Sequence, residues 1–267
     1  MARPKISKIK TANPVGEQLA QLVLNQSLSA DQQAQRRELT MAHILNNSSH
    51  IDQPNFAKIS SEDLGNMFHI IDEHYFEGLV SRLCERESSV PIRFRLSTRM
   101  TSTGGMTTMR GKPGVGLRTF EIALATTPLF ETFRIETSAT VGGLICQNRL
   151  EAMQRIVEHE VVHLIELLLW HDSSCSRNPF KDVVYRFFGH VESNHRMLTP
   201  RDIAKKKLGI GPGDKVVFNF EGKSYSGIIN RISKRATVLV PSPNGVRYTD
   251  GHRYVKFYVP LRCLQRV

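Results

Sequence analysis

The apolar segment IVEHEVVHLIELLLW, residues 156–170, constrains the fold of this chain more than any other. Its apolar residues recur at helical spacing, and we predict a buried helix over residues 148–169. Buried helices rarely carry charge, yet this one contains His159, Glu160 and His163. Burying these three groups without a metal or hydrogen-bonding partners costs several kcal/mol. The segment therefore predicts either a metal site or a set of hydrogen-bonded core histidines.

The order His159-Glu160-Val161-Val162-His163 is the HExxH pattern. Histidines four residues apart lie on one helix face, so both imidazoles can reach one ion. Neutral imidazole is a good ligand of zinc, and we predict Zn²⁺ as the cofactor, bound by His159 and His163. Glu160 is the predicted catalytic residue, a general base that takes a proton from a zinc-activated water and delivers it to a leaving amine.

By composition and hydrophobic pattern, the rest of the chain divides into an appended N-terminal segment, a domain of mixed helices and strands, and a β-rich C-terminal segment. Residues 1–55 are rich in Gln, Asn and Ser, with helices expected near 15–25 and 30–46, and we predict a partly mobile helical extension. Residues 56–200 combine helical periodicity, alternating strands and the HExxH segment. They predict an α+β domain.

The order of several motifs in residues 60–200 resembles that of the SprT-like metalloproteases, which include bacterial SprT and eukaryotic Spartan. The segments are LGNMFHIIDEHYFEGLV, PIRFRLSTRMTSTGGMTT and HEVVHLIELLLW, followed by PFKDVVYRFFG. The resemblance implies a zincin-like metallopeptidase core with one zinc and a first β-hairpin that turns at Gly104-Gly105. It also implies cleavage of loosely folded or DNA-bound proteins and, in Spartan-type members, repair of DNA–protein crosslinks stimulated by DNA.

The third zinc ligand departs from the family pattern. The family has a histidine at the start of the helix after the loop, whereas this chain has Ser176 there, and serine is a poor zinc ligand. Its neighbour Cys175 is a strong ligand because a zinc-bound thiol ionises, and we predict Cys175 as the third ligand. His171, His190 and His195 stay open as alternatives. The last two follow a helix of about 15 Å, which favours a separate role.

Residues 209–267 contain short strands separated by Glu-Gly, Asn-Gly and Asp-Gly turns. This pattern predicts a small all-β barrel of SH3-like type. Aromatic and basic residues alternate within it, as they do in proteins that bind single-stranded nucleic acid. Docking of a protein partner and mere structural support stay open as alternatives. The predicted nucleic-acid-binding residues are Lys223, Arg231, Lys234, Arg235 and Arg253.

Charge and composition indicate the partners and the compartment. The formal net charge of +11 predicts attraction to a polyanion, and we expect DNA as a partner beside a protein substrate. No run approaches the roughly 18 apolar residues that span a bilayer, so no membrane partner is expected. The four cysteines are scattered without CxxC spacing and no secretory signal is visible, which predicts a cytoplasmic protein.

These patterns together predict a zinc metallopeptidase, a hydrolase of proteins associated with or crosslinked to DNA. Replacement of the third histidine favours an alternative, a non-catalytic nucleic-acid-binding protein on the same fold with a degenerate or structural metal site. A zinc hydrolase with a different substrate is a third possibility, because HExxH does not itself specify a peptide.

Overall fold

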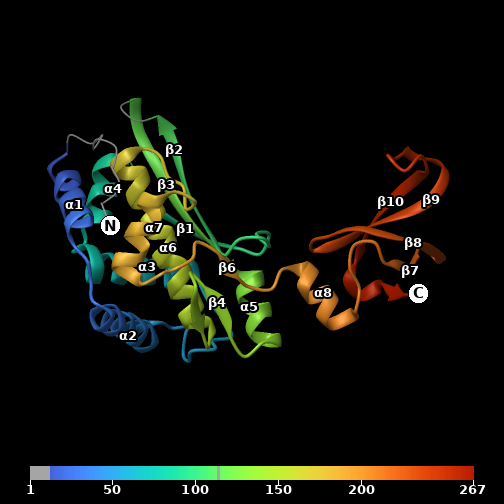
Figure 1. The fold of residues 1–267 in the computed structure, drawn as a ribbon, viewed down its shortest axis with the longest axis horizontal. Coiled ribbons are helices and arrows are strands. Elements are labelled where there is room, and N and C mark those ends of the chain that lie inside the picture. The colour runs from blue at the N-terminus through green and yellow to red at the C-terminus, as the bar shows by residue number, and fades with distance from the viewer. Residues whose placement is uncertain (1–12, 89, 113–114) are drawn as a thin grey trace. The chain divides into compact units, whose positions relative to one another are not determined.

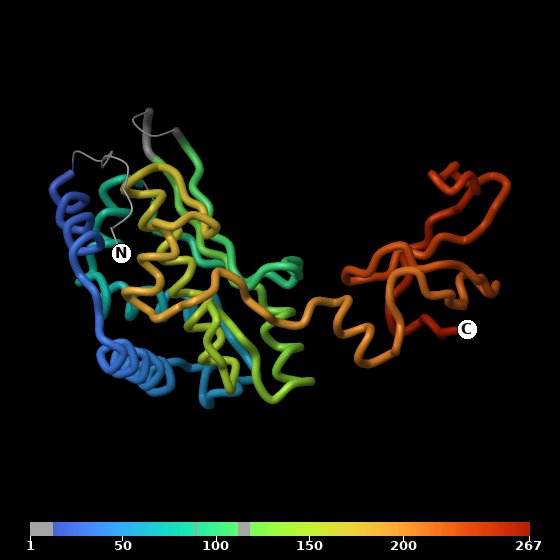
Figure 2. The backbone as a smooth tube through the Cα atoms, viewed as in Figure 1, coloured from blue at the N-terminus to red at the C-terminus, as the bar shows by residue number. Residues whose placement is uncertain are grey.

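The structure, a computed structural model, describes residues 13–88, 90–112 and 115–267 (Figure 1). The chain divides into two compact units, Met1–Met197 and Leu198–Val267, called unit 1 and unit 2 below. Both contain helices and small, mostly antiparallel sheets. Figure 2 shows the course of the backbone through them. The predicted α+β class is therefore confirmed.

Unit 1 places its helices around one apolar core and two small sheets. Its helices are α1 (Pro14–Asn25), α2 (Ala30–Asn47), α3 (Ser61–Phe76), α4 (Leu79–Glu87), α5 (Thr126–Ile135), α6 (Arg149–Trp170) and α7 (Asn178–Phe188). Its strands are β1 (Arg93–Ser97), β2 (Gly105–Lys112), β3 (Val115–Ala125), β4 (Ala139–Val141), β5 (Leu144–Cys146) and β6 (His195–Arg196).

Helix α6 is the central element of unit 1 and contains the HExxH segment. Eighteen of its 22 residues are buried, so neighbouring elements surround it on nearly every side. The side chain of Asn148 caps its start by accepting a hydrogen bond from the Glu151 amide at 2.9 Å. The helix ends where His171 adopts a left-handed conformation, with φ of 57°. The structure therefore confirms the helix predicted over residues 148–169.

The first sheet has the strand order β1-β3-β2, which contradicts the hairpin expected at Gly104-Gly105. Strand β3 runs parallel to β1 and antiparallel to β2, so the hairpin joins β2 to β3. The two glycines precede and begin β2, and neither has a positive φ. A glycine pair occurs either at a turn or where the backbone closely approaches another group. Here the pair marks a close approach and not a turn.

The second sheet has the order β5-β4-β6 and brings the segment after α7 back to the core. Gly189 ends α7 with φ of 73°, a left-handed conformation that glycine adopts without strain. The chain then returns so that His195 pairs with Val141 of β4. This sheet is what places His195 near α6, although the eleven residues of α7 lie between them in the sequence.

The N-terminal helices pack on the same core as α6. Leu19 and Val23 of α1 and Ile44 of α2 are fully buried in it. Gln33 of α2 donates hydrogen bonds to the carbonyls of Tyr185 and Arg186, each at 3.1 Å. The described part of residues 1–55 is thus integral to unit 1 rather than an appended extension. Residues 1–12 lie outside the described residues.

Unit 2 consists of α8 and one five-stranded antiparallel sheet. Its elements are α8 (Pro200–Leu208), β7 (Lys215–Phe220), β8 (Lys223–Ile232), β9 (Arg235–Arg247), β10 (Arg253–Pro260), the 3₁₀ turn η1 (Leu261–Cys263) and β11 (Gln265–Arg266). The strand order β10-β9-β8-β7-β11 is open, because β10 and β11 do not pair within this fully described unit. The SH3-like barrel therefore stays a prediction, while the all-β pattern from residue 215 onward is observed.

Candidate metal centre

The two imidazoles of the HExxH helix converge on one point. The Nε2 atoms of His159 and His163 lie 3.1 Å apart. Nitrogen ligands of a tetrahedral zinc ion lie about 3.3 Å apart, given zinc–nitrogen bonds of about 2.0–2.1 Å. Burial lowers the pKa of His163 to about 4, and burial together with nearby His195 holds the pKa of His159 well below its ordinary value. Both rings are therefore neutral at pH 7, the form that binds a metal.

A hydrogen-bond chain orients the His163 ring. Its Nδ1 lies 2.6 Å from the Ser173 hydroxyl, which in turn donates to the Glu166 carboxylate at 2.6 Å. Because that hydroxyl proton is given to Glu166, the Ser173 oxygen accepts from Nδ1–H of His163. The proton on Nδ1 leaves Nε2 with a lone pair directed at the His159 Nε2, where it can accept a hydrogen bond or bind an ion. Such outer partners are typical of metal-binding histidines.

Glu160 lies in the same region with its carboxylate held by β2. The Thr107 hydroxyl donates to the Glu160 carboxylate at 2.7 Å. Burial raises the Glu160 pKa to about 7, and the Thr107 hydrogen bond partly opposes that rise. A methyl group on Gly105 would lie 2.6 Å from the Glu160 carboxylate, so any larger residue there would force that side chain to shift. A carboxylate with a pKa near neutrality is suited to accept and release a proton.

Two groups of side chains in this region could bind an ion, and both include His159. One contains His159, His163 and Cys175, and the other contains His159, Glu160 and His195. Within each group the ligand atoms lie within 4.8 Å of one another. The structure thus brings the predicted third ligand Cys175 to the two histidines. It also brings His195 to His159 and Glu160.

The other two alternative ligands lie elsewhere. The His190 Nε2 contacts the Glu158 carboxylate at 2.9 Å in a fully buried cluster that also contains Arg155. This is the separate role that the sequence favoured for His190. His171 ends α6 and belongs to neither of the candidate groups found among the described residues.

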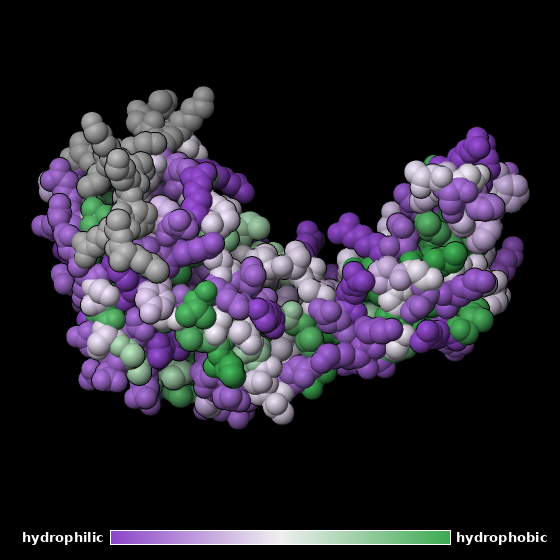
Figure 3. Space-filling view, viewed as in Figure 1, coloured by the Kyte–Doolittle hydropathy of each residue, from purple (hydrophilic) through white to green (hydrophobic). Residues whose placement is uncertain are grey.

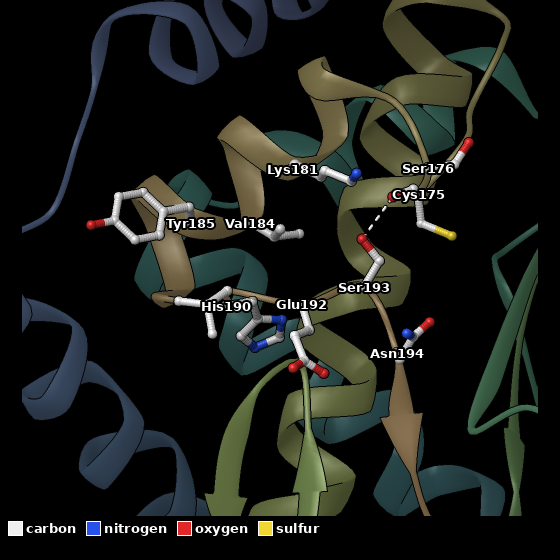
Figure 4. A pocket seen from close by; sticks show the side chains of 10 residues that line it. Cys175, Ser176, Lys181, Val184, Tyr185, His190, Glu192, Ser193 and Asn194 are labelled. Atoms are coloured by element: carbon white, nitrogen blue, oxygen red, sulfur yellow. Dashed lines mark hydrogen bonds between the residues drawn. The ribbon is translucent and has the colours of Figure 1, made fainter. Parts of the chain in front are cut away.

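A cleft of about 610 Å³ opens over these side chains. Met106 and Thr107 of β2 line one side, and Ser193 and Asn194 line the other. A second cavity of about 640 Å³ shares Cys175, Ser193 and Asn194 with the cleft. Figure 4 shows the second cavity, with the Ser193 hydroxyl donating to the Cys175 carbonyl at 2.7 Å and the Cys175 sulfur directed away from Tyr185.

The five predicted nucleic-acid-binding residues do not form one patch in unit 2. Arg231, Lys234 and Arg235 gather at the turn between β8 and β9. Lys223 lies at the opposite end of β8, roughly 26 Å away at 3.3 Å per residue. Arg253 begins β10, and the other end of that strand pairs with Arg235. The Arg253 side chain donates a hydrogen bond to the Gly245 carbonyl at 3.0 Å.

Positive charge is concentrated in unit 2. Leu198–Val267 contains fourteen Lys or Arg and four Asp or Glu, an excess of ten out of the net +11 of the chain. Hydrophilic residues cover much of the face that this unit presents in Figure 3. The aromatics divide between two roles. Phe218 is buried in the core of the sheet, whereas Phe220 and Tyr258 are 48% and 65% exposed.

Comparison of the chain with models of known protein families, with curated proteins and with solved structures found no match in any of the three. The SprT-like resemblance therefore stays a prediction from the motifs. Among the residues that the structure describes, every helix is too short or too polar to traverse a lipid bilayer.

Several residues of the site had no signal in the sequence. Thr107 lies in the segment with the glycine pair and Ser173 in the loop after the HExxH helix, but no sequence pattern marks either residue as a partner of that helix. Glu166 follows His163 by three residues and therefore shares its helix face, which was a usable signal. Gly105 was recognised as unusual but was assigned to a turn.

Proposed function

We propose that this chain is a zinc-dependent hydrolase of polypeptides, built on a zincin-like core of the SprT type. The observation that carries the proposal is the 3.1 Å separation of the His159 and His163 Nε2 atoms, with the buried Glu160 carboxylate beside them in one cleft. Two neutral imidazoles and a carboxylate with a raised pKa are the groups that metal-assisted hydrolysis uses.

Each side chain of the site has a defined task in this proposal. His159, His163 and Cys175 hold the ion, and the Ser173–Glu166 chain fixes the His163 ring. When bound, zinc polarises a substrate carbonyl and acidifies a water molecule. Glu160 accepts the proton from the attacking water and passes it to the leaving amine. Thr107 holds that carboxylate in place throughout.

Strand β2 is the proposed support for the substrate backbone. It is an edge strand of the order β1-β3-β2, and its first residues line the cleft. An extended polypeptide could pair with this edge through main-chain hydrogen bonds, which select backbone rather than sequence. Such binding suits an enzyme that cleaves varied, loosely folded proteins.

Unit 2 is the proposed DNA-binding part, and residues 209–267 are proposed to adopt the SH3-like fold. The support is its excess of ten positive charges and the cluster of Arg231, Lys234 and Arg235. Exposed Phe220 and Tyr258 offer surfaces for base stacking. Binding of DNA by this unit would direct cleavage to proteins bound or crosslinked to it.

The variant Glu160→Gln tests the catalytic assignment. Zinc content should stay near one ion per chain, because the two imidazoles are retained, while cleavage of an unfolded protein should vanish. Glu131→Gln, on α5 and outside the lining of the cleft, is the matched control and should cleave normally. Unchanged proteolysis by Glu160→Gln would contradict the assigned role.

The concentration of charge in unit 2 also favours the alternative, a non-catalytic nucleic-acid-binding protein. Elemental analysis of the purified chain separates the two functions. About one zinc per chain, lost on His159→Ala, supports the hydrolase. Full DNA binding by a chain that takes up no zinc supports the alternative.

A further inference from the structure

The second ligand group shares His159 with the first but contains neither His163 nor Cys175. It consists of His159, Glu160 and His195, with ligand atoms within 4.8 Å of one another. The His195 ring centroid lies 4.7 Å from that of His159. The His195 Nδ1 is buried and has no hydrogen-bond partner among the described residues. The imidazole that carries this unpartnered nitrogen lies beside a carboxylate and a second imidazole, and the three side chains together could bind an ion.

Two glycines at the start of β2 leave space for side chains of this second group. A methyl group on Gly104 would lie 2.9 Å from Cδ2 of His195, and one on Gly105 would lie 2.6 Å from the Glu160 carboxylate. Two consecutive glycines therefore make room for two of the three members. The Thr107 hydroxyl donates to Oε2 of Glu160, whereas Oε1 is the atom nearest to the place where a methyl group on Gly105 would lie.

One ion cannot use both groups at once in this arrangement. Nitrogen and sulfur ligands of a tetrahedral ion lie about 3.3–3.6 Å apart. Cys175 and His195 share no group within 4.8 Å among the described residues, and neither do His163 and His195. His159 is the single common member. The two groups are therefore alternative positions for one ion rather than one larger coordination sphere.

We propose that the site has two overlapping metal positions that share His159, and that Cys175 holds the ion in the first, away from Glu160. In the second position Glu160 and His195 become ligands. The inference rests on the proposed metal site and adds its regulation. Glu160 is free to act as a base only while Cys175 retains the ion, so loss of the thiolate converts the site into a bound but inactive form.

The contacts of Cys175 suit this role. The Ser193 hydroxyl donates a hydrogen bond to the backbone carbonyl of Cys175. Ser193 precedes His195 of β6 by two residues, so this bond connects the loop that carries the thiol to the segment that carries His195. Cys175 is also partly exposed, unlike Cys84 and Cys146, which are buried. A thiol reagent can therefore reach Cys175 and release the ion towards Glu160.

Cobalt(II) in place of zinc tests the proposal, because a thiolate–cobalt bond adds near-ultraviolet absorbance that nitrogen and oxygen ligands lack. The full chain should bind one Co²⁺ with this band. His195→Ala and Glu160→Gln should keep both the ion and the band. Cys175→Ser should keep the ion but lose the band. The double variant Cys175→Ser/His195→Ala should bind Co²⁺ at least about tenfold more weakly than either single variant.

Matched controls are Cys263→Ser and His252→Ala, which remove an exposed thiol and an exposed imidazole in unit 2. Cys175→Ala and His195→Asn replace any variant that fails to fold. The proposal is overturned if Cys175→Ser alone loses the ion as completely as the double variant, or if the double variant binds as tightly as the single ones. A wild-type chain that binds no Co²⁺ overturns the metal site itself, and one that binds it without the band overturns only the role of Cys175.

Discussion

At the scale of single residues, the missing side chain of Gly105 matters as much as the carboxylate beside it. In Gly105→Ala the new methyl group would lie 2.6 Å from the Glu160 carboxylate, which must then move. We expect zinc content to be unchanged and peptide hydrolysis to fall by about 10- to 100-fold, part of what a positioned base contributes. Gly211→Ala is the control, because its methyl group would meet nothing closer than 4.0 Å. Equal activity of the two variants would contradict the placement of Glu160.

The hydrogen bond from Thr107 sets the pH at which Glu160 can act. The Glu160 pKa, raised by burial to about 7, is lowered by this bond, so Thr107→Val should raise it further. Because the base must be ionised, activity falls as pH drops through this pKa, and the acid limb should move up by about one pH unit. The measurement is the pH profile of kcat/KM. Thr108→Val, the next residue on β2, is the control, and an identical acid limb in both variants would refute the assignment.

The sequence predicts the residues of the site that bind metal or act as a base better than it predicts the residues that hold them in position. His159, Glu160 and His163 follow from spacing along one helix, which is a local property. Thr107 and Ser173 reach that helix from segments 53 and 10 residues distant from the groups they contact, so local patterns do not reveal them. The glycine pair was visible, but whether it made a turn or a close approach depended on the arrangement of the sheet.

At the scale of elements, a buried ion pair within α6, Arg155–Glu158, is linked to the segment that follows α7 by the hydrogen bond between Glu158 and His190. Burial alone would raise the Glu158 pKa, but Arg155 and His190 hold it below its usual value. Glu158→Gln leaves Arg155 without a counter-charge and should lower the free energy of unfolding by about 3–5 kcal/mol, measured by urea denaturation. The control Glu131→Gln breaks a pair of the same i,i+3 spacing whose side chains are 24% and 59% exposed. Its expected loss is about 0–1 kcal/mol, and a similar loss in both variants would contradict the prediction.

Helices were more predictable from the sequence than the pairing of strands. The periodicity that predicts α6 is local, and the structure reproduces this helix. The cap of α2 at Ser29 is likewise a local interaction. The parallel pairing of β1 with β3 joins residues about 28 positions apart and depends on how α6 fills the space beside the sheet. The polar composition before residue 55 concealed the few apolar residues, such as Leu19 and Ile44, that anchor α1 and α2.

At the scale of the whole molecule, charge and metal chemistry are assigned to different units. Unit 1 contains both candidate ligand groups and carries only one of the eleven net positive charges, and unit 2 carries the rest. This division lets the two proposed functions be altered independently. Variants in unit 2 should change attraction to DNA without changing the metal content, and variants in α6 should do the reverse.

The salt dependence of DNA binding tests this division. Exchanging Arg231, Lys234 and Arg235 for Gln removes the charge cluster at the β8–β9 turn. If these residues contact phosphates, the slope of log Kd against log salt should fall by about 2–3, because each contact contributes about 0.7–0.9. The control exchanges three exposed, ion-paired arginines of unit 1, Arg93, Arg134 and Arg196. It removes the same charge, so an equal change of slope in both triple variants would show that net charge, and not the turn, attracts DNA. Zinc content should stay the same in both.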